Sequence, residues 1–160
     1  MVNVMKSNTI KMAVSLEEYI PLKVIIDRKA EPLKSISYSK DRTSFLEITV
    51  GMTSGLIKRI TLLLSKEYDI NETRLNIDVY EIGDITISDE LKNSCSYFKT
   101  HLYKDGIKIE ISEQKVFKYI KMDRLYIGLS QLNCIAEICL CELTSDEINH
   151  IKNELDYQEK

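Results

Sequence analysis

The sequence predicts an α+β fold that is mainly antiparallel β, built as a sheet or sandwich with one C-terminal helix. Three observations predict it. Apolar residues alternate with polar ones in many short stretches, as expected for strands whose successive side chains point to opposite faces. Glycine-containing turn signals separate several of these stretches at the spacing of hairpins. Close to the C-terminus, the apolar period changes to that of a helix.

The first hairpin is expected in the first half of the chain. From Leu46 to Met52 every second residue is apolar, and the residues between them are polar or glycine. Gly51 and Gly55 then bracket a short turn, and a second apolar stretch follows over residues 56–64. This pattern predicts two antiparallel strands joined by the turn.

Two further strand pairs are expected next. Residues 75–79 alternate between apolar and polar types, and residues 85–87 follow the turn-like residues 83–84, which predicts a second pair. Residues 97–103 and 107–111 flank a turn signal that contains a glycine, which predicts a second hairpin. As an alternative for part of this region, residues 89–96 could form a short helix.

The last strands and the helix complete the chain. Residues 125–129 and 136–141 are both rich in apolar types, and the second stretch is apolar on both faces, so it is expected in the middle of a sheet. Thr144 stands three residues before Glu147, which is the spacing of a reciprocal capping box at a helix start. Apolar residues then recur at helical spacing, which predicts a helix over residues 145–156.

The chain is expected to be a single domain over residues 1–160. Its 160 residues suit one core, and no repeat or linker-like stretch divides them. Residues 1–15 can form a loosely ordered N-terminal arm. They lack the apolar run of a secretory signal, and no later stretch has the roughly 18 apolar residues of a membrane helix. We therefore expect a cytoplasmic protein that does not bind membranes.

The sequence contains no recognisable catalytic or metal-binding motif. Cys134, Cys139 and Cys141 lack the paired spacing of zinc ligands, and they fall in an apolar region where small buried core cysteines are expected. His101 and His150 have no nearby second ligand in sequence, and no serine lies in a known nucleophile motif. The sequence therefore predicts no enzyme activity, no catalytic residue, no cofactor and no metal site.

Charge is distributed unevenly along the chain. Residues 67–90 hold eight Asp or Glu against Arg74 alone, a net charge of −7, whereas residues 1–66 carry +5 and residues 91–124 carry +4. On one reading, acidic strands pair with basic ones and leave a mixed, solvated surface. On the other, the block forms an acidic face that attracts a basic protein partner by electrostatic steering. Such a face would repel phosphates, which disfavours direct nucleic-acid binding.

Four stretches together carry a family resemblance, and they span roughly residues 43–155. They are residues 46–48, 55–62, 122–129 and 138–148. In them the chain resembles small Bacillus-type proteins, several of which are encoded beside polymorphic or contact-dependent toxins and look like their immunity proteins. The resemblance implies a protein that binds a cognate toxin domain, a nuclease being one class, and neutralises it by occluding its active site or substrate groove.

The charge count, and not the family pattern, selects the residues expected to bind this partner. They lie in the acidic block and include one tyrosine, a residue type favoured in interfaces. They are Asp69, Glu72, Asp78, Tyr80, Glu81 and Asp84. In an alternative mode, the toxin would extend an exposed strand edge and would not need this patch.

Two other function classes stay open. A small-molecule-binding or enzymatic β domain would form its site only in three dimensions, for example as a deep pocket containing His101 with two carboxylates. A structural subunit of a larger assembly would expose a broad apolar surface instead of an acidic one.

Overall fold

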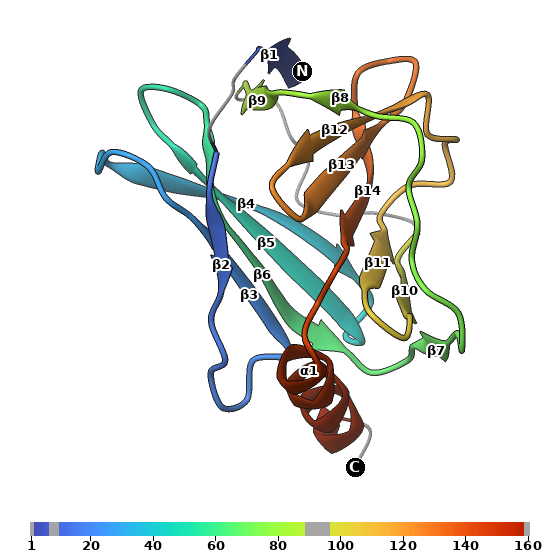
Figure 1. Cartoon of the computed structure of the whole chain (residues 1–160). Helices are drawn as coiled ribbons and strands as arrows, with labels where there is room; N and C mark the ends of the chain where they lie inside the picture. Colours follow the sequence, from blue (N-terminus) through green and yellow to red (C-terminus); the bar gives the residue numbers. More distant parts are fainter. Residues whose placement is uncertain (1, 7–9, 89–96, 159–160) are drawn as a thin grey trace.

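The computed structural model describes residues 2–6, 10–88 and 97–158, which form two large sheets, one small sheet and one helix (Figure 1). The fold is α+β and mainly antiparallel, as the sequence predicts. The two large sheets pack against each other as a sandwich, and their inward-facing side chains form one continuous core. Ile48 of one sheet and Ile109 and Ile127 of the other are fully buried in it.

The first large sheet has five strands, and all its neighbouring strands are antiparallel. In spatial order they are β2 (Met12–Val14), β3 (Leu22–Ile26), β6 (Ile57–Ser65), β5 (Ser44–Gly51) and β4 (Leu33–Lys40). The predicted first hairpin is confirmed, because β5 and β6 pair directly through the turn that ends at Gly55. Gly55 has a φ of 72°, a left-handed conformation that favours glycine.

The second large sheet has seven strands. In spatial order they are β7 (Asp69–Ile70), β10 (Lys99–Leu102), β11 (Ile107–Glu110), β14 (Ile135–Leu140), β13 (Leu125–Leu129), β12 (Lys118–Met122) and β8 (Glu81–Ile82). The five inner strands are antiparallel, and the two-residue edge strands β7 and β8 are parallel to their neighbours. The predicted second hairpin is confirmed as β10 and β11, and the predicted central strand is confirmed as β14, in which every residue is buried.

The expected strand pair between residues 75–79 and 85–87 is wrong. β9 (Asp84–Ile87) pairs instead with β1 (Val2–Met5), while residues 75–79 form no strand. The alternation in that stretch has another cause: Leu75 packs on a sheet face, and its N–H donates to the Asp105 side chain at 2.9 Å instead of to a neighbouring strand. Leu75 and the partly buried Ile77 pack on the sheet, whereas Val79, the last apolar residue of the alternation, is 83% exposed.

Two short strands lie within the expected N-terminal arm, the four residues of β1 and the three residues of β2. Within residues 1–15, β1 pairs with β9 and β2 pairs with β3, and the Met12 N–H also donates to the Asp123 carboxylate at 3.0 Å. Residues 7–9, and the short helix considered for residues 89–96, lie outside the described residues.

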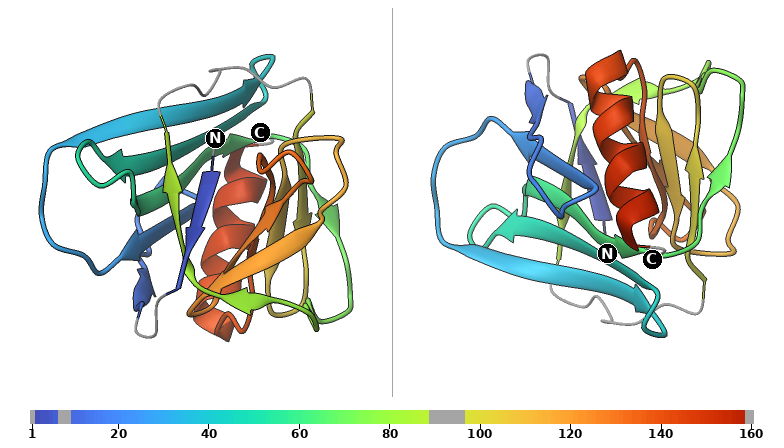
Figure 2. Two further views of the ribbon diagram at one scale, coloured as in Figure 1. Left: turned by 90° about the horizontal axis from the view of Figure 1, so that it is seen from above. Right: turned by 90° about the horizontal axis from the view of Figure 1, so that it is seen from below.

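The helix α1 (Ser145–Gln158) lies between the two large sheets at one end of the sandwich, as both views of Figure 2 show. Its start is the predicted capping box: the Glu147 N–H donates to Thr144 Oγ1 at 3.2 Å, and the Thr144 N–H donates to Glu147 Oε1 at 2.9 Å. Ile151 and Leu155 point into the core and are fully buried. No helix in the described part of the chain is long and apolar enough to cross a membrane.

Candidate functional site

The candidate site is formed where residues 71–80 cross the outer face of the seven-stranded sheet. This crossing segment connects β7 at one edge of the sheet to β8 at the opposite edge, and it runs along the outside of the molecule in light green (Figure 1). Leu75 anchors it in a small apolar cluster with Tyr126, Cys139 and Cys141. Gly106 permits the close approach, because a Cβ there would lie 2.9 Å from the Cβ of Leu75.

The strand register aligns four ionisable side chains on the sheet face that the segment crosses. Lys108, Cys139, Tyr126 and Lys121 are consecutive cross-strand partners on β11, β14, β13 and β12. Because side chains alternate along each strand, all four belong to the outer face, while neighbours such as Ile138 point into the core.

Glu137 is the centre of a buried polar network on this face. Its Oε1 accepts hydrogen bonds from the Tyr119 hydroxyl at 2.5 Å and from the Cys139 thiol at 3.1 Å, and Lys108 Nζ lies 4.0 Å away. Burial raises the pKa of the Cys139 thiol well above its ordinary value, and the carboxylate of Glu137 adds to the shift. The same two causes raise the pKa of Tyr119. The thiol therefore stays protonated as a donor to Glu137, and the network is suited to structure more than to nucleophilic chemistry.

Asp84 is not part of the surface. It is 5% exposed, and its two carboxylate oxygens accept hydrogen bonds from Arg28 Nη1 and Nη2, each at 2.6 Å. Arg28 Nε also donates to the carbonyl of Ile57, so this bidentate pair joins β9 to the five-stranded sheet. Asp84 is thus removed from the predicted partner-binding set.

Asp69 is exposed but lies at the far edge of the sheet from Glu81. Its Oδ2 is 3.4 Å from His101 Nδ1, and His101 Nε2 is 2.8 Å from Glu110 Oε2. His101 therefore stands between two carboxylates. The pockets of about 570, 400, 380 and 280 Å³ in the described part of the chain are all lined by other residues. The two carboxylates considered for an enzymatic site are therefore beside His101, and His101 lines none of these four pockets.

The remaining predicted residues lie on or beside the crossing segment and are exposed. Among the described side chains, none forms an ion pair with Glu72, Asp78 or Glu81. Tyr80 is 40% exposed, and its ring packs edge-on against Tyr126 with the centroids 5.5 Å apart. Among the acids selected from the sequence, Asp84 is buried in an ion pair and Asp69 is exposed beside His101, whereas Glu72, Asp78 and Glu81 are exposed without an ion-pair partner among the described side chains.

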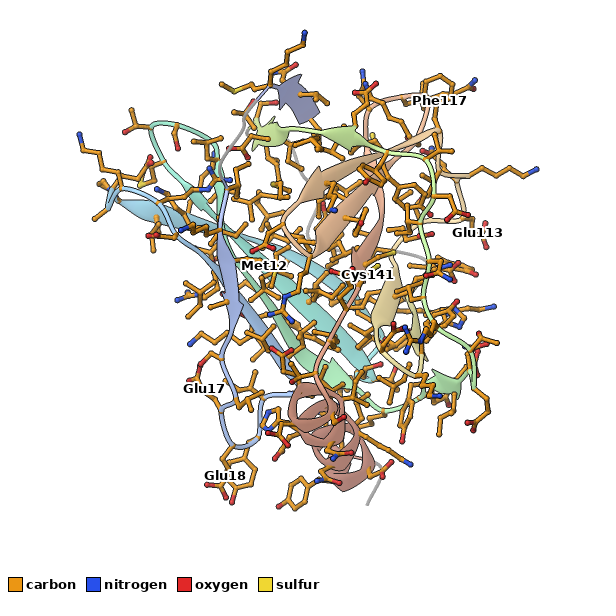
Figure 3. All side chains as sticks on the ribbon, in the orientation of Figure 1. Met12, Glu17, Glu18, Glu113, Phe117 and Cys141 are labelled. Atoms are coloured by element: carbon orange, nitrogen blue, oxygen red, sulfur yellow. The ribbon has the colours of Figure 1, made fainter. Side chains whose placement is uncertain are left out.

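A pocket of about 380 Å³ lies beside the crossing segment and brings Asp78 and Tyr80 together. Its lining also includes side chains that were not predicted from the sequence: Arg74, Asp105, Lys121, Tyr126, Cys141 and Glu142. These residues come from separate strands and turns, so only the folded sheet brings them to one place. Cys141, which is labelled in Figure 3, follows directly after β14 and lines this pocket.

Exposed apolar side chains border the same region. Val79 is 83% exposed and Phe117 is 64% exposed, and they line a second pocket of about 280 Å³ together with Tyr80 and Glu81. Phe117 also lines a third pocket of about 570 Å³, and it projects from the upper end of the sheet in Figure 3. Apolar and aromatic groups next to unpaired acids are typical of protein-binding surfaces.

In the parts of the chain that the structure describes, no group of three His, Cys, Asp or Glu side chains is placed to hold a metal ion.

No protein-family model and no curated protein matches this chain. The resemblance to toxin immunity proteins therefore stays a prediction, and the case for a function depends on the chemistry of this surface.

Proposed function

We propose that this protein is a cytoplasmic, non-enzymatic immunity protein that binds a cognate toxin domain with a basic surface, such as a nuclease, and occludes its active site or substrate groove. The single observation that carries the proposal is the set of exposed acids on and beside the crossing segment, Glu72, Asp78 and Glu81, with which no side chain in the described ranges forms an ion pair. Carboxylates presented in this way can compete with phosphate groups for the same basic side chains.

The size of the surface is compatible with one interface. β7 and β8 are separated by six inter-strand steps, and at about 4.8 Å per step the crossing segment spans about 29 Å. A standard interface buries about 800 Å² on each partner, which corresponds to a disc about 32 Å across. The acids and the exposed apolar groups around Val79 and Phe117 can therefore contact one partner at the same time.

Co-expression with the toxin encoded by the adjacent gene tests the proposal. We expect restored growth of toxin-producing cells and a complex that survives gel filtration. The double reversal Asp78→Lys and Glu81→Lys is expected to slow association about 10-fold at low salt and to weaken its salt dependence. The matched double reversal Glu18→Lys and Asp27→Lys, at exposed acids just before and just after β3, should leave association unchanged. Failure to form any complex would reject the proposal.

The pocket beside the crossing segment favours one second candidate, a domain that binds a small molecule. Its mixture of two basic, three acidic and two aromatic side chains could hold a polar ligand. Native mass spectrometry of the purified protein tests this candidate, because a retained small molecule lost on Lys121→Met would support it. A ligand-free spectrum together with toxin neutralisation would eliminate it.

A further inference from the structure

In the pocket beside the crossing segment, the ammonium group of Lys121 lies against two tyrosine rings. Lys121 Nζ lies 5.0 Å from the ring centroid of Tyr80 and 5.6 Å from that of Tyr126. The two rings meet at an interplanar angle of 79°, so the ammonium faces both of them. Cation–π attraction of this kind is strongest where the cation is partly desolvated. The tyrosine pair is thus arranged to hold a positive group.

The charges around the pair also favour a cation. Asp78, Asp105 and Glu142 line the pocket, and they outnumber its two basic residues, Arg74 and Lys121. Burial acts to lower the pKa of Lys121, but its interactions with Tyr126, Tyr80 and Glu142 outweigh burial and raise that pKa. The environment therefore stabilises positive charge at this position even without a partner.

An external group can reach the pair. Tyr80, Asp78 and Glu142 are exposed, whereas Tyr126 is only 8% exposed and forms the floor. Lys121 reaches the rings by a flexible four-carbon stem, so its ammonium can withdraw to solvent without any change in the backbone of β12.

We propose that this pocket receives an arginine side chain of the protein partner, whose guanidinium replaces the Lys121 ammonium against Tyr80 and Tyr126 and pairs with Asp78. Arginine fits better than lysine because its planar guanidinium stacks on aromatic rings and binds carboxylates in a bidentate manner. The inference rests on the proposed function, since it names the group that a basic toxin surface would insert.

Two substitutions at Tyr80 separate the ring from its hydroxyl. Tyr80→Phe keeps the aromatic face, and Tyr80→Leu removes it; the position is exposed enough to leave the fold intact in both variants, which thermal unfolding would check. With the toxin as partner, we expect Tyr80→Leu to weaken binding about 10-fold and Tyr80→Phe to weaken it less than about 2-fold. Lys121→Met, which removes the competing ammonium, is expected to tighten binding about 3-fold.

A partner-free measurement uses the peptide acetyl-Gly-Gly-Arg-Gly-Gly-amide at millimolar concentrations, followed by NMR. Shifts at Tyr80 and Tyr126 are expected with this peptide, and not with its citrulline analogue, which is neutral and of the same shape. Equal behaviour of the two peptides, or equal affinities of Tyr80→Leu and Tyr80→Phe for the toxin, would overturn the inference.

The two proposals fail in different ways. Neutralisation of the toxin with no effect of the Tyr80 and Lys121 variants would reject the arginine pocket and leave the proposed function standing. Selective binding of the arginine peptide without any toxin complex would reject the proposed function and support the pocket.

Discussion

Asp78 and Asp84 belong to the same acidic block and are six residues apart, yet the fold uses them in opposite ways. Asp84 is buried in a bidentate pair with Arg28, and it joins β9 to the rest of the sandwich. Asp78 is exposed on the crossing segment, where no described side chain forms an ion pair with it, and it lines a pocket. The comparison teaches that a charge count locates an acidic segment but does not separate acids that hold the fold from acids that are free to bind.

The largest effect is expected where the buried pair is broken. Asp84→Asn removes the negative charge and leaves the Arg28 guanidinium buried without a counter-ion, which should lower the free energy of unfolding by about 3–5 kcal/mol. Urea denaturation measures the change. Asp78→Asn is the matched control, and it should change stability by less than about 0.5 kcal/mol. A similar loss in both variants would contradict the division into structural and free acids.

The next test compares Cys141, which belongs to the apolar cluster under the crossing segment, with the exposed Cys134. Burial, together with the charges of Asp105 and Glu142, raises the pKa of Cys141 to about 11. Its thiolate fraction at pH 8 is then roughly 100-fold below that of an ordinary thiol, so alkylation by iodoacetamide should be slower by about that factor. Cys134 is exposed and is expected to react first. Residue-resolved mass spectrometry follows both, and rapid labelling of Cys141 would indicate that the crossing segment opens readily.

A smaller loss is expected from the network beneath the crossing segment. Glu137→Ala deprives the Tyr119 hydroxyl and the Cys139 thiol of their shared acceptor and should cost about 2 kcal/mol in the free energy of unfolding. Glu113→Ala, at an exposed position, serves as the control. If the two variants unfold at the same urea concentration, the network does not stabilise the sheet.

The smallest effect concerns an acid that caps a turn. Glu31 accepts hydrogen bonds from the Ser54 N–H and hydroxyl and pairs with Lys58, and these contacts lower its pKa to about 2. Because the folded pKa lies below the ordinary value, the stabilisation is present above about pH 4.5 and is lost as the pH falls toward 2. Glu31→Gln should therefore flatten the decline of stability in this window. Urea denaturation midpoints measured between about pH 4.5 and 2 check this. If the midpoints of Glu31→Gln fall in parallel with those of the wild type, Glu31 does not stabilise the fold in this way.

The elements that were predictable are those whose signal is local. The β5–β6 hairpin, the all-buried strand β14 and the capping box of α1 each follow from residues close together in sequence. The pairing of β1 with β9 did not, because more than half of the chain separates partners such as Val2 and Ile87. No short-range sequence pattern identifies which strand will pair with β9.

The candidate site was predictable only in part. Asp78 and Tyr80 were selected because they lie in a conspicuous charge block. Lys121, Tyr126 and Glu142 each look like ordinary residues of a strand or turn, and they gain meaning only when β12, β13 and the end of β14 converge. The bidentate partner of Asp84 was missed for the same reason, since Arg28 is 56 residues away.

The two edges of the seven-stranded sheet are the very short strands β7 and β8, and the crossing segment joins one directly to the other. Unprotected sheet edges template pairing with other chains. A proteolytic cut within residues 71–80 would leave β7 joined to the fold only through β6, and β8 only through β9, so both edge strands would be held less firmly at the same time. In this architecture, an intact crossing segment therefore protects both edges of the sheet from pairing with other chains.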